Sequence, residues 1–270
     1  MILSDYLEKK LLDLLLVNTA YSPPATLYFG LFTADPGPSG VANEFTIGVG
    51  SYARAVVTNN VSNFPLCSAV ASPAVKTNGS IIAFPTATTA WGTATYWAVY
   101  DAATAGNMLA HGVLSAPWAV ASGSTPKIMT GAMTITASNS SSGGLTAYAQ
   151  RKLLDHVFSA TTYTSAAAVY SGLGTALTGD SISEWTDSGY ARQSTAFTAS
   201  TLGSGFCANT STQTFTAAAA GSDTITHFGI WDAASAGNLL VTGPVGSSRS
   251  VVASDTVKLL AGSAIVVTFQ

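Results

Sequence analysis

Hydrophobic positions near the start of the chain recur at helical spacing. Apolar side chains stand three or four residues apart, at Leu3, Leu7, Leu11, Leu14 and Leu15. Ser4 and Asp5 stand at the head of this stripe, and both residue types favour the N-terminal end of a helix. The pattern predicts an amphipathic helix that covers one face of a larger domain.

Beyond this helix the pattern changes to short apolar or aromatic segments separated by Gly, Pro, Asn and Asp. These segments predict strands at 27–33, 54–58, 80–84, 93–100, 108–114 and 133–137. Residues 101–107 read as a hairpin connection, since Asp101 can accept backbone hydrogen bonds and Gly106 tolerates a positive φ. Such spacing is typical of β-sandwiches and jelly rolls.

The second half of the chain repeats the first in the same order. Lys10-Leu-Leu-Asp13 returns as Lys152-Leu-Leu-Asp155, Tyr52-Ala-Arg54 as Tyr190-Ala-Arg192, and the block 100–109 as 231–240. A second helix is expected, capped by Thr146, with Ala149, Leu153, Val157 and Phe158 as its stripe.

The repeats predict a tandem duplication. The first domain spans 1–138, a Ser/Gly linker spans 139–144, and the second domain spans 145–270. The expected fold class is mainly β, with two tandem β-sandwich or jelly-roll-like domains, each preceded by an N-terminal α-helix.

Charge is scarce throughout the chain. Only 9% of the 270 residues are charged, 47% are hydrophobic, and the formal net charge is −3. These values exclude a disordered chain and a basic nucleic-acid-binding protein. No segment reaches the roughly 18 consecutive apolar residues of a membrane-spanning helix. Neutral Thr, Ser and Ala must cover much of the surface, which suits a protein packed into an assembly.

Residues that carry catalytic or metal chemistry are few. His111, His156 and His227 are far apart in sequence and occupy unmatched positions in the two copies. Cys67 and Cys207 are single cysteines in their halves, and we expect both to be free and buried. We therefore expect no catalytic residue, no cofactor and no metal site.

One acidic cluster, formed by Asp180, Glu184 and Asp187, offers the paired carboxylates that glycoside hydrolysis requires. It lies in a segment rich in Ser, Thr and Gly and lacks the spacing of a calcium loop. A solvated loop is the favoured interpretation of this cluster, and a glycan depolymerase is the enzyme interpretation that it leaves open.

An acid followed by an arginine recurs in both copies. Glu44 precedes Arg54 in the first, and Glu184 precedes Arg192 in the second. The favoured interpretation is a structural ion pair within each domain. The alternative is an ion pair between subunits, for which the planar fork of arginine is well suited.

Several ordered blocks carry a family resemblance: 28–33, 51–54 and 84–88 in the first copy, and 189–193 and 226–240 in the second. Together they resemble a bacteriophage virion family of tail fibre proteins. The resemblance implies a structural protein of the phage particle. At the level of fold alone, compact β domains of this kind also resemble jelly-roll cement proteins that decorate phage heads.

We expect a non-enzymatic virion protein that is assembled in the host cytoplasm. The favoured interpretation is a capsid cement or decoration protein whose twin domains bridge and stabilise neighbouring capsid subunits. Its partners would be the major capsid protein or other virion proteins, with symmetric homo-oligomerisation and without nucleic acid or membrane. The alternative is a tail or fibre component that binds host glycans, and a glycan depolymerase is the third interpretation.

Overall fold

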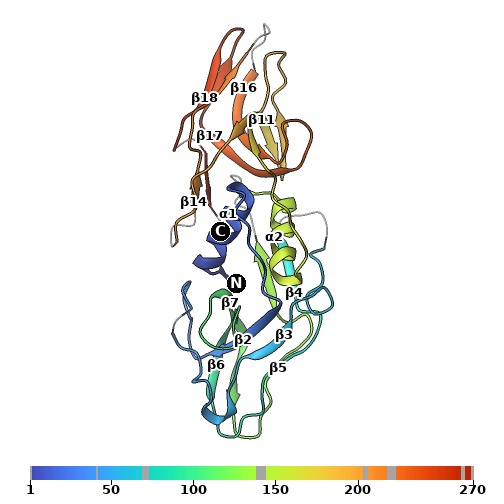
Figure 1. Ribbon diagram of the computed structural model, residues 1–270, viewed down its shortest axis with the longest axis vertical. Helices are drawn as coiled ribbons and strands as arrows, with labels where there is room; N and C mark the ends of the chain where they lie inside the picture. The colour runs from blue at the N-terminus through green and yellow to red at the C-terminus, as the bar shows by residue number, and fades with distance from the viewer. Residues whose placement is uncertain are drawn as a thin grey trace.

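The computed structural model describes residues 2–40, 42–68, 73–137, 144–202, 206–217, 223–262 and 265–268. The expected mainly β fold with two tandem β-rich halves is confirmed. Figure 1 shows the two copies at opposite ends of an elongated molecule, with both helices between them. The expected linker 139–144 lies outside the described residues, except that Gly144 begins a strand.

Both predicted helices form, and both use the predicted caps. In α1 (Asp5–Leu16) the Ser4 hydroxyl accepts a hydrogen bond from the Leu7 amide at 3.2 Å. In α2 (Ala147–Ser159) Thr146 accepts one from the Ala149 amide at 3.3 Å. Such a cap satisfies an amide that the first helical turn leaves without a partner. Neither helix is long and apolar enough to cross a membrane, as judged over the described residues.

Each half contains one larger antiparallel sheet. In the first, the order is β1 (Ile2–Leu3), β7 (Met108–Val120), β6 (Gly92–Tyr100), β2 (Thr26–Phe32) and β3 (Ala55–Thr58). In the second it is β10 (Gly144–Leu145), β17 (Leu239–Val251), β16 (Asp223–Trp231), β11 (Val169–Thr178) and β12 (Ser181–Glu184). There β13 (Gln193–Thr195) also pairs with β11. Since β3 and β13 each follow the repeated Tyr-Ala-Arg block, β13 is the counterpart of β3, and with this pairing the two sheets repeat one strand order.

Two-stranded sheets complete each half. They are β4 (Ala74–Thr77) with β9 (Thr134–Ala137) and β5 (Ile82–Ala83) with β8 (Lys127–Ile128) in the first copy. Their counterparts are β14 (Phe206–Ala208) with β19 (Val266–Thr268) and β15 (Gln213–Thr216) with β18 (Thr256–Leu259). A short 3-10 turn, η1 (Val49–Ser51), precedes β3.

Two strand predictions need correction, and one further strand was not predicted. The strand expected at 80–84 shrinks to β5, since Pro85 and Pro126 flank the pair and lack an N–H group. The strand expected at 108–114 continues to Val120. It includes Pro117 at a place where the register with β6 shifts, and such places tolerate proline. Strand β4 was not expected, because Lys76 interrupts its apolar pattern.

The helices join the two halves. Each contacts the larger sheet of its own copy and a two-stranded sheet of the other: α1 contacts β7 and β14, and α2 contacts β17 and β4. Buried apolar side chains of both copies consequently belong to one cluster. We call α1, α2, β4 and β14 together the helix seam.

Candidate functional site

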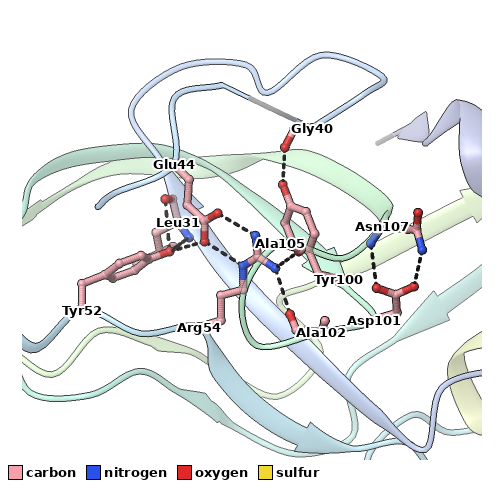
Figure 2. A network of polar contacts seen from close by, with 10 residues as sticks. All are labelled: Leu31, Gly40, Glu44, Tyr52, Arg54, Tyr100, Asp101, Ala102, Ala105 and Asn107. Atoms are coloured by element: carbon pink, nitrogen blue, oxygen red, sulfur yellow. Dashed lines mark hydrogen bonds and ion pairs between the residues drawn. The ribbon is translucent and has the colours of Figure 1, made fainter. Parts of the chain in front are cut away.

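The predicted acid and arginine of the first copy form a buried fork (Figure 2). Arg54 lies just before β3, and Glu44 forms a single bridge with Phe32 at the end of β2. Arg54 Nε donates to Glu44 Oε1 at 2.9 Å, and Nη2 donates to Oε2 at 2.8 Å. Only 4% of the arginine side chain and 18% of the glutamate side chain are exposed. This bidentate pairing is the geometry for which arginine is suited.

The remaining nitrogen of Arg54 holds the hairpin connection that follows β6. Its Nη1 donates to the carbonyl oxygens of Ala102 at 2.9 Å and Ala105 at 2.8 Å. The guanidinium carbon also lies 3.4 Å from the ring centre of Tyr100, a cation–π contact. One side chain therefore joins β3, the acid after β2 and the β6–β7 connection, as Figure 2 shows.

The connection itself closes as expected from its sequence. Asp101 accepts hydrogen bonds from the Asn107 backbone amide and side-chain amide, both at 2.7 Å. Ala105 and Gly106 have positive φ angles of 49° and 73°. The aspartate thus serves a turn, which explains its repetition without a metal ion.

Tyr52 is a member of the network that its sequence position did not reveal. Its hydroxyl donates to Glu44 Oε1 at 3.1 Å and accepts from the Leu31 amide at 2.8 Å. Burial and then the adjacent Glu44 charge raise the pKa of this hydroxyl. The signal that could have identified it is the repeated Tyr-Ala-Arg block, which keeps the tyrosine two residues before the arginine.

The second copy builds the same network. Arg192 Nε and Nη2 donate to Glu184 at 2.7 and 2.6 Å, and Nη1 donates to the carbonyls of Ala233 and Ala236. Tyr190 again donates to the acid, at 2.9 Å. Trp231 takes the place that Tyr100 has in the first copy, and the guanidinium carbon of Arg192 lies 4.0 Å from the centre of its ring. Both arginines pair within their own copies; a role between subunits stays a prediction.

The acidic cluster is divided among separate structural contacts. Glu184 is held by Arg192 and Tyr190, as described above. Asp180 accepts from the Ala147 amide at the start of α2, at 3.0 Å, and Asp187 accepts from the Gly189 amide at 2.8 Å. Over the described part of the chain, no group of three or more His, Cys, Asp or Glu residues could hold a metal ion.

An open groove of about 710 Å³ lies beside the second network. Its walls come from the segment between Glu184 and Arg192 and from the connection that holds Ala234 and Ser235. The lining combines charged, hydroxyl and aromatic side chains. Its exposed hydroxyl groups can form hydrogen bonds with a ligand, whereas Trp185 is buried, with 2% of its surface exposed.

Comparison with known proteins gives one family. The family model described as podophage GP4 fiber I protein gp80 matches residues 2–136 and again residues 144–267. The chain belongs to this fibre family. Its two matches fall on the two copies, so the tandem duplication is a duplication of the family's domain. No curated protein matches the chain.

Membership of the fibre family makes the chain a component of the phage virion. The match fits the tail or fibre interpretation better than the head cement interpretation, for which it offers no support. The jelly-roll likeness that suggested cement was a likeness of fold alone, and folds of this kind serve many functions.

Proposed function

We propose that this protein is a non-enzymatic structural component of a phage tail fibre that contacts the host surface. The observation that carries the proposal is the fibre family's match to both copies. The elongated arrangement in Figure 1 supports it, because the helix seam leaves the two larger sheets at opposite ends of the molecule. One end can then attach to the particle while the other meets the host.

The groove beside Glu184 and Arg192 is the proposed host contact. Arg192, which lines the groove, is held in place, because each of its nitrogens already bonds to the acid or to a loop carbonyl. A rigid site loses little conformational entropy on binding a ligand. Ser188 and Ser235 add exposed hydroxyls along the walls, and host glycans are the chemical class that such a groove fits.

A structural role, and not glycan hydrolysis, is proposed for the acidic cluster. Glycosidase acids must reach the bond that is cleaved, one as a proton donor and the other as a nucleophile or base. Both oxygens of Glu184 accept hydrogen bonds from Arg192, so this carboxylate is already engaged within the domain and is not directed at a ligand. Other virion proteins and symmetric self-association remain the proposed partnerships, since the surface is neutral.

Gold-labelled antibody on intact particles tests the proposed location. Label along tail fibres is the expected result, and label confined to the head would overturn the proposal. Particles that lack this protein should also adsorb more slowly to host cells.

The host contact has its own test. The change Ala234→Trp fills the groove mouth, and Ala103→Trp is the matched control at the equivalent position of the first copy. We expect the first variant to weaken equilibrium binding of the particle to host cells by about tenfold, which corresponds to roughly 1.4 kcal/mol, and to reduce adsorption accordingly. Equal adsorption by the two variants would exclude the groove while leaving the fibre location intact.

A further inference from the structure

The helix seam holds a lysine that is buried completely. Lys76, on β4 of the first copy, has a fully buried side chain and forms an ion pair with Asp155 of α2 in the second copy. Its ammonium group also donates to Ser159 Oγ at 2.7 Å and to the Pro65 carbonyl at 2.8 Å. A charge in such a place is tolerated only when it is paired and hydrogen-bonded. Its main partner comes from the other copy.

Further hydrogen bonds from α2 to the first copy surround this pair. Asp155 also accepts from the Cys67 amide at 2.8 Å, and Gln150 accepts from the Ala74 amide at 3.1 Å. Two more hydrogen bonds, each 2.7 Å long, join the copies: Ser159 donates to the Phe64 carbonyl, and Asn59 donates to the Val157 carbonyl. The first copy thus contacts α2 through buried polar groups as well as through apolar packing.

The opposite side of the helix seam repeats the arrangement. Asp13 of α1 corresponds to Asp155 in the repeated Lys-Leu-Leu-Asp block, and it accepts from the Ser200 amide of the second copy at 2.7 Å. Each helix therefore presents the same carboxylate to a backbone amide of the other copy. This reciprocity is the mark of an isologous, two-fold interface.

The two sides differ at one position. Lys76 pairs with Ile135 in the β4–β9 sheet, and Cys207 takes the corresponding place opposite Val267 in the β14–β19 sheet. On that side the carboxylate of Asp13 pairs instead with Lys9 of its own helix, at 2.6 Å. The charge at the helix seam is balanced across the copies on one side and within a single helix on the other.

We propose that the helix seam is a self-recognition surface whose partner is the complementary half of a second copy of this chain. The contacts of Asp155, Gln150 and Ser159 with the first copy, and of Asp13 with Ser200, each join one half to the other. A half contributed by another molecule can make the same contacts, as in reciprocal domain exchange. The junction keeps the two halves at high local concentration and thereby favours closure within one chain.

The test uses the full chain with a protease site placed in the 139–143 junction. The folded protein is cleaved, and native mass spectrometry and size-exclusion chromatography record whether the halves stay together. Unlabelled and isotope-labelled samples, both cleaved, are then mixed, unfolded in urea and refolded together. We expect the halves to stay paired after cleavage, and mixed pairs to be as abundant as parental pairs after refolding.

Two substitutions distinguish specific pairing of the two halves from non-specific association. Lys76→Met leaves the Asp155 carboxylate with the Cys67 amide but without a cation, and should weaken pairing of the halves on the order of 100-fold or more. Lys127→Met, at an exposed strand position of the same copy, is the matched control and should change nothing. Asp155→Asn keeps the acceptor oxygen and provides a second, milder variant.

Two outcomes would overturn the proposal. One is separation of the cleaved halves into independently folded species. The other is pairing that is equally strong in Lys76→Met, Asp155→Asn and Lys127→Met.

Discussion

Replacing Arg54 or Arg192 by alanine allows the stability loss of the same network to be compared between the two copies. Arg54→Ala removes the fork on Glu44, both bonds to the β6–β7 connection and the contact with Tyr100. Arg192→Ala removes the same set of contacts in the second copy. The two networks differ in burial and in the aromatic ring beside the guanidinium, which is Tyr100 in the first copy and Trp231 in the second.

The exposed fractions set the expected magnitudes. In the first copy 4% of the arginine and 18% of the glutamate side chain are exposed, against 8% and 27% in the second. Loss of one partner of a buried pair costs about 3–5 kcal/mol of unfolding free energy. We expect Arg54→Ala to fall in this range and Arg192→Ala to cost about 2 kcal/mol, because water screens the more exposed pair. At roughly 2–4 °C per kcal/mol, Arg54→Ala should lower Tm by about 6–20 °C.

Urea and thermal denaturation measure these losses, with Arg249→Ala as a control at an exposed position of β17. Arg54→Lys should lose most of the stability as well, because an ammonium group cannot reproduce the planar fork. If Arg54→Ala were as stable as Arg249→Ala, the network would not hold the connection in place. A stable variant that failed to enter the particle would instead reveal an interface between subunits.

Two further predictions concern titratable groups at or near the helix seam. Burial, and then the charge of the neighbouring Asp5, raise the pKa of Glu8 from 4.5 to about 7. The contribution of the protonated Glu8 carboxyl to folding stability is therefore complete below pH 4.5 and is lost as the pH rises through 7. Glu8→Gln, which copies Gln150 of α2, should therefore raise Tm at pH 8 and leave it nearly unchanged at pH 4.5; an equal effect at both pH values would contradict this. Burial raises the pKa of the Cys67 and Cys207 thiols to about 12, so neither should react with a maleimide at pH 7 until urea unfolds the chain. Labelling followed by mass spectrometry checks this, and prompt reaction of the native protein would refute it.

The helices and most strands were predictable because their signals are local. Ser4 and Thr146 stand immediately before apolar stripes, and the Asp-to-Asn connections repeat almost letter for letter. Strand β4 was not predictable, because Lys76 reads as a solvated position. Asp155 is the partner that permits burial of the Lys76 side chain. It is remote in sequence, so no local pattern predicts this ion pair.

The sequence predicted the charged residues of the candidate site but not the backbone groups and the groove around them. Repetition singled out Glu44 with Arg54 and Glu184 with Arg192. The carbonyl oxygens that receive the remaining arginine nitrogen belong to alanines, whose identity says nothing about hydrogen bonding. The groove likewise depends on how two segments approach one another, which no single segment encodes.

The scarcity of charge takes on a definite meaning once the cations are located. Arg54 and Arg192 hold a connection within each copy, Lys76 holds the copies to each other, and Lys9 pairs with Asp13 of its own helix, so four of the ten cations form ion pairs within the chain. Fewer cations then remain for the surface than composition alone indicates. Long-range attraction needs surface charge, whereas contact between closely fitted neutral surfaces does not. The contacts proposed above, with other virion proteins and with the host, should therefore depend on shape and hydrogen bonds more than on charge.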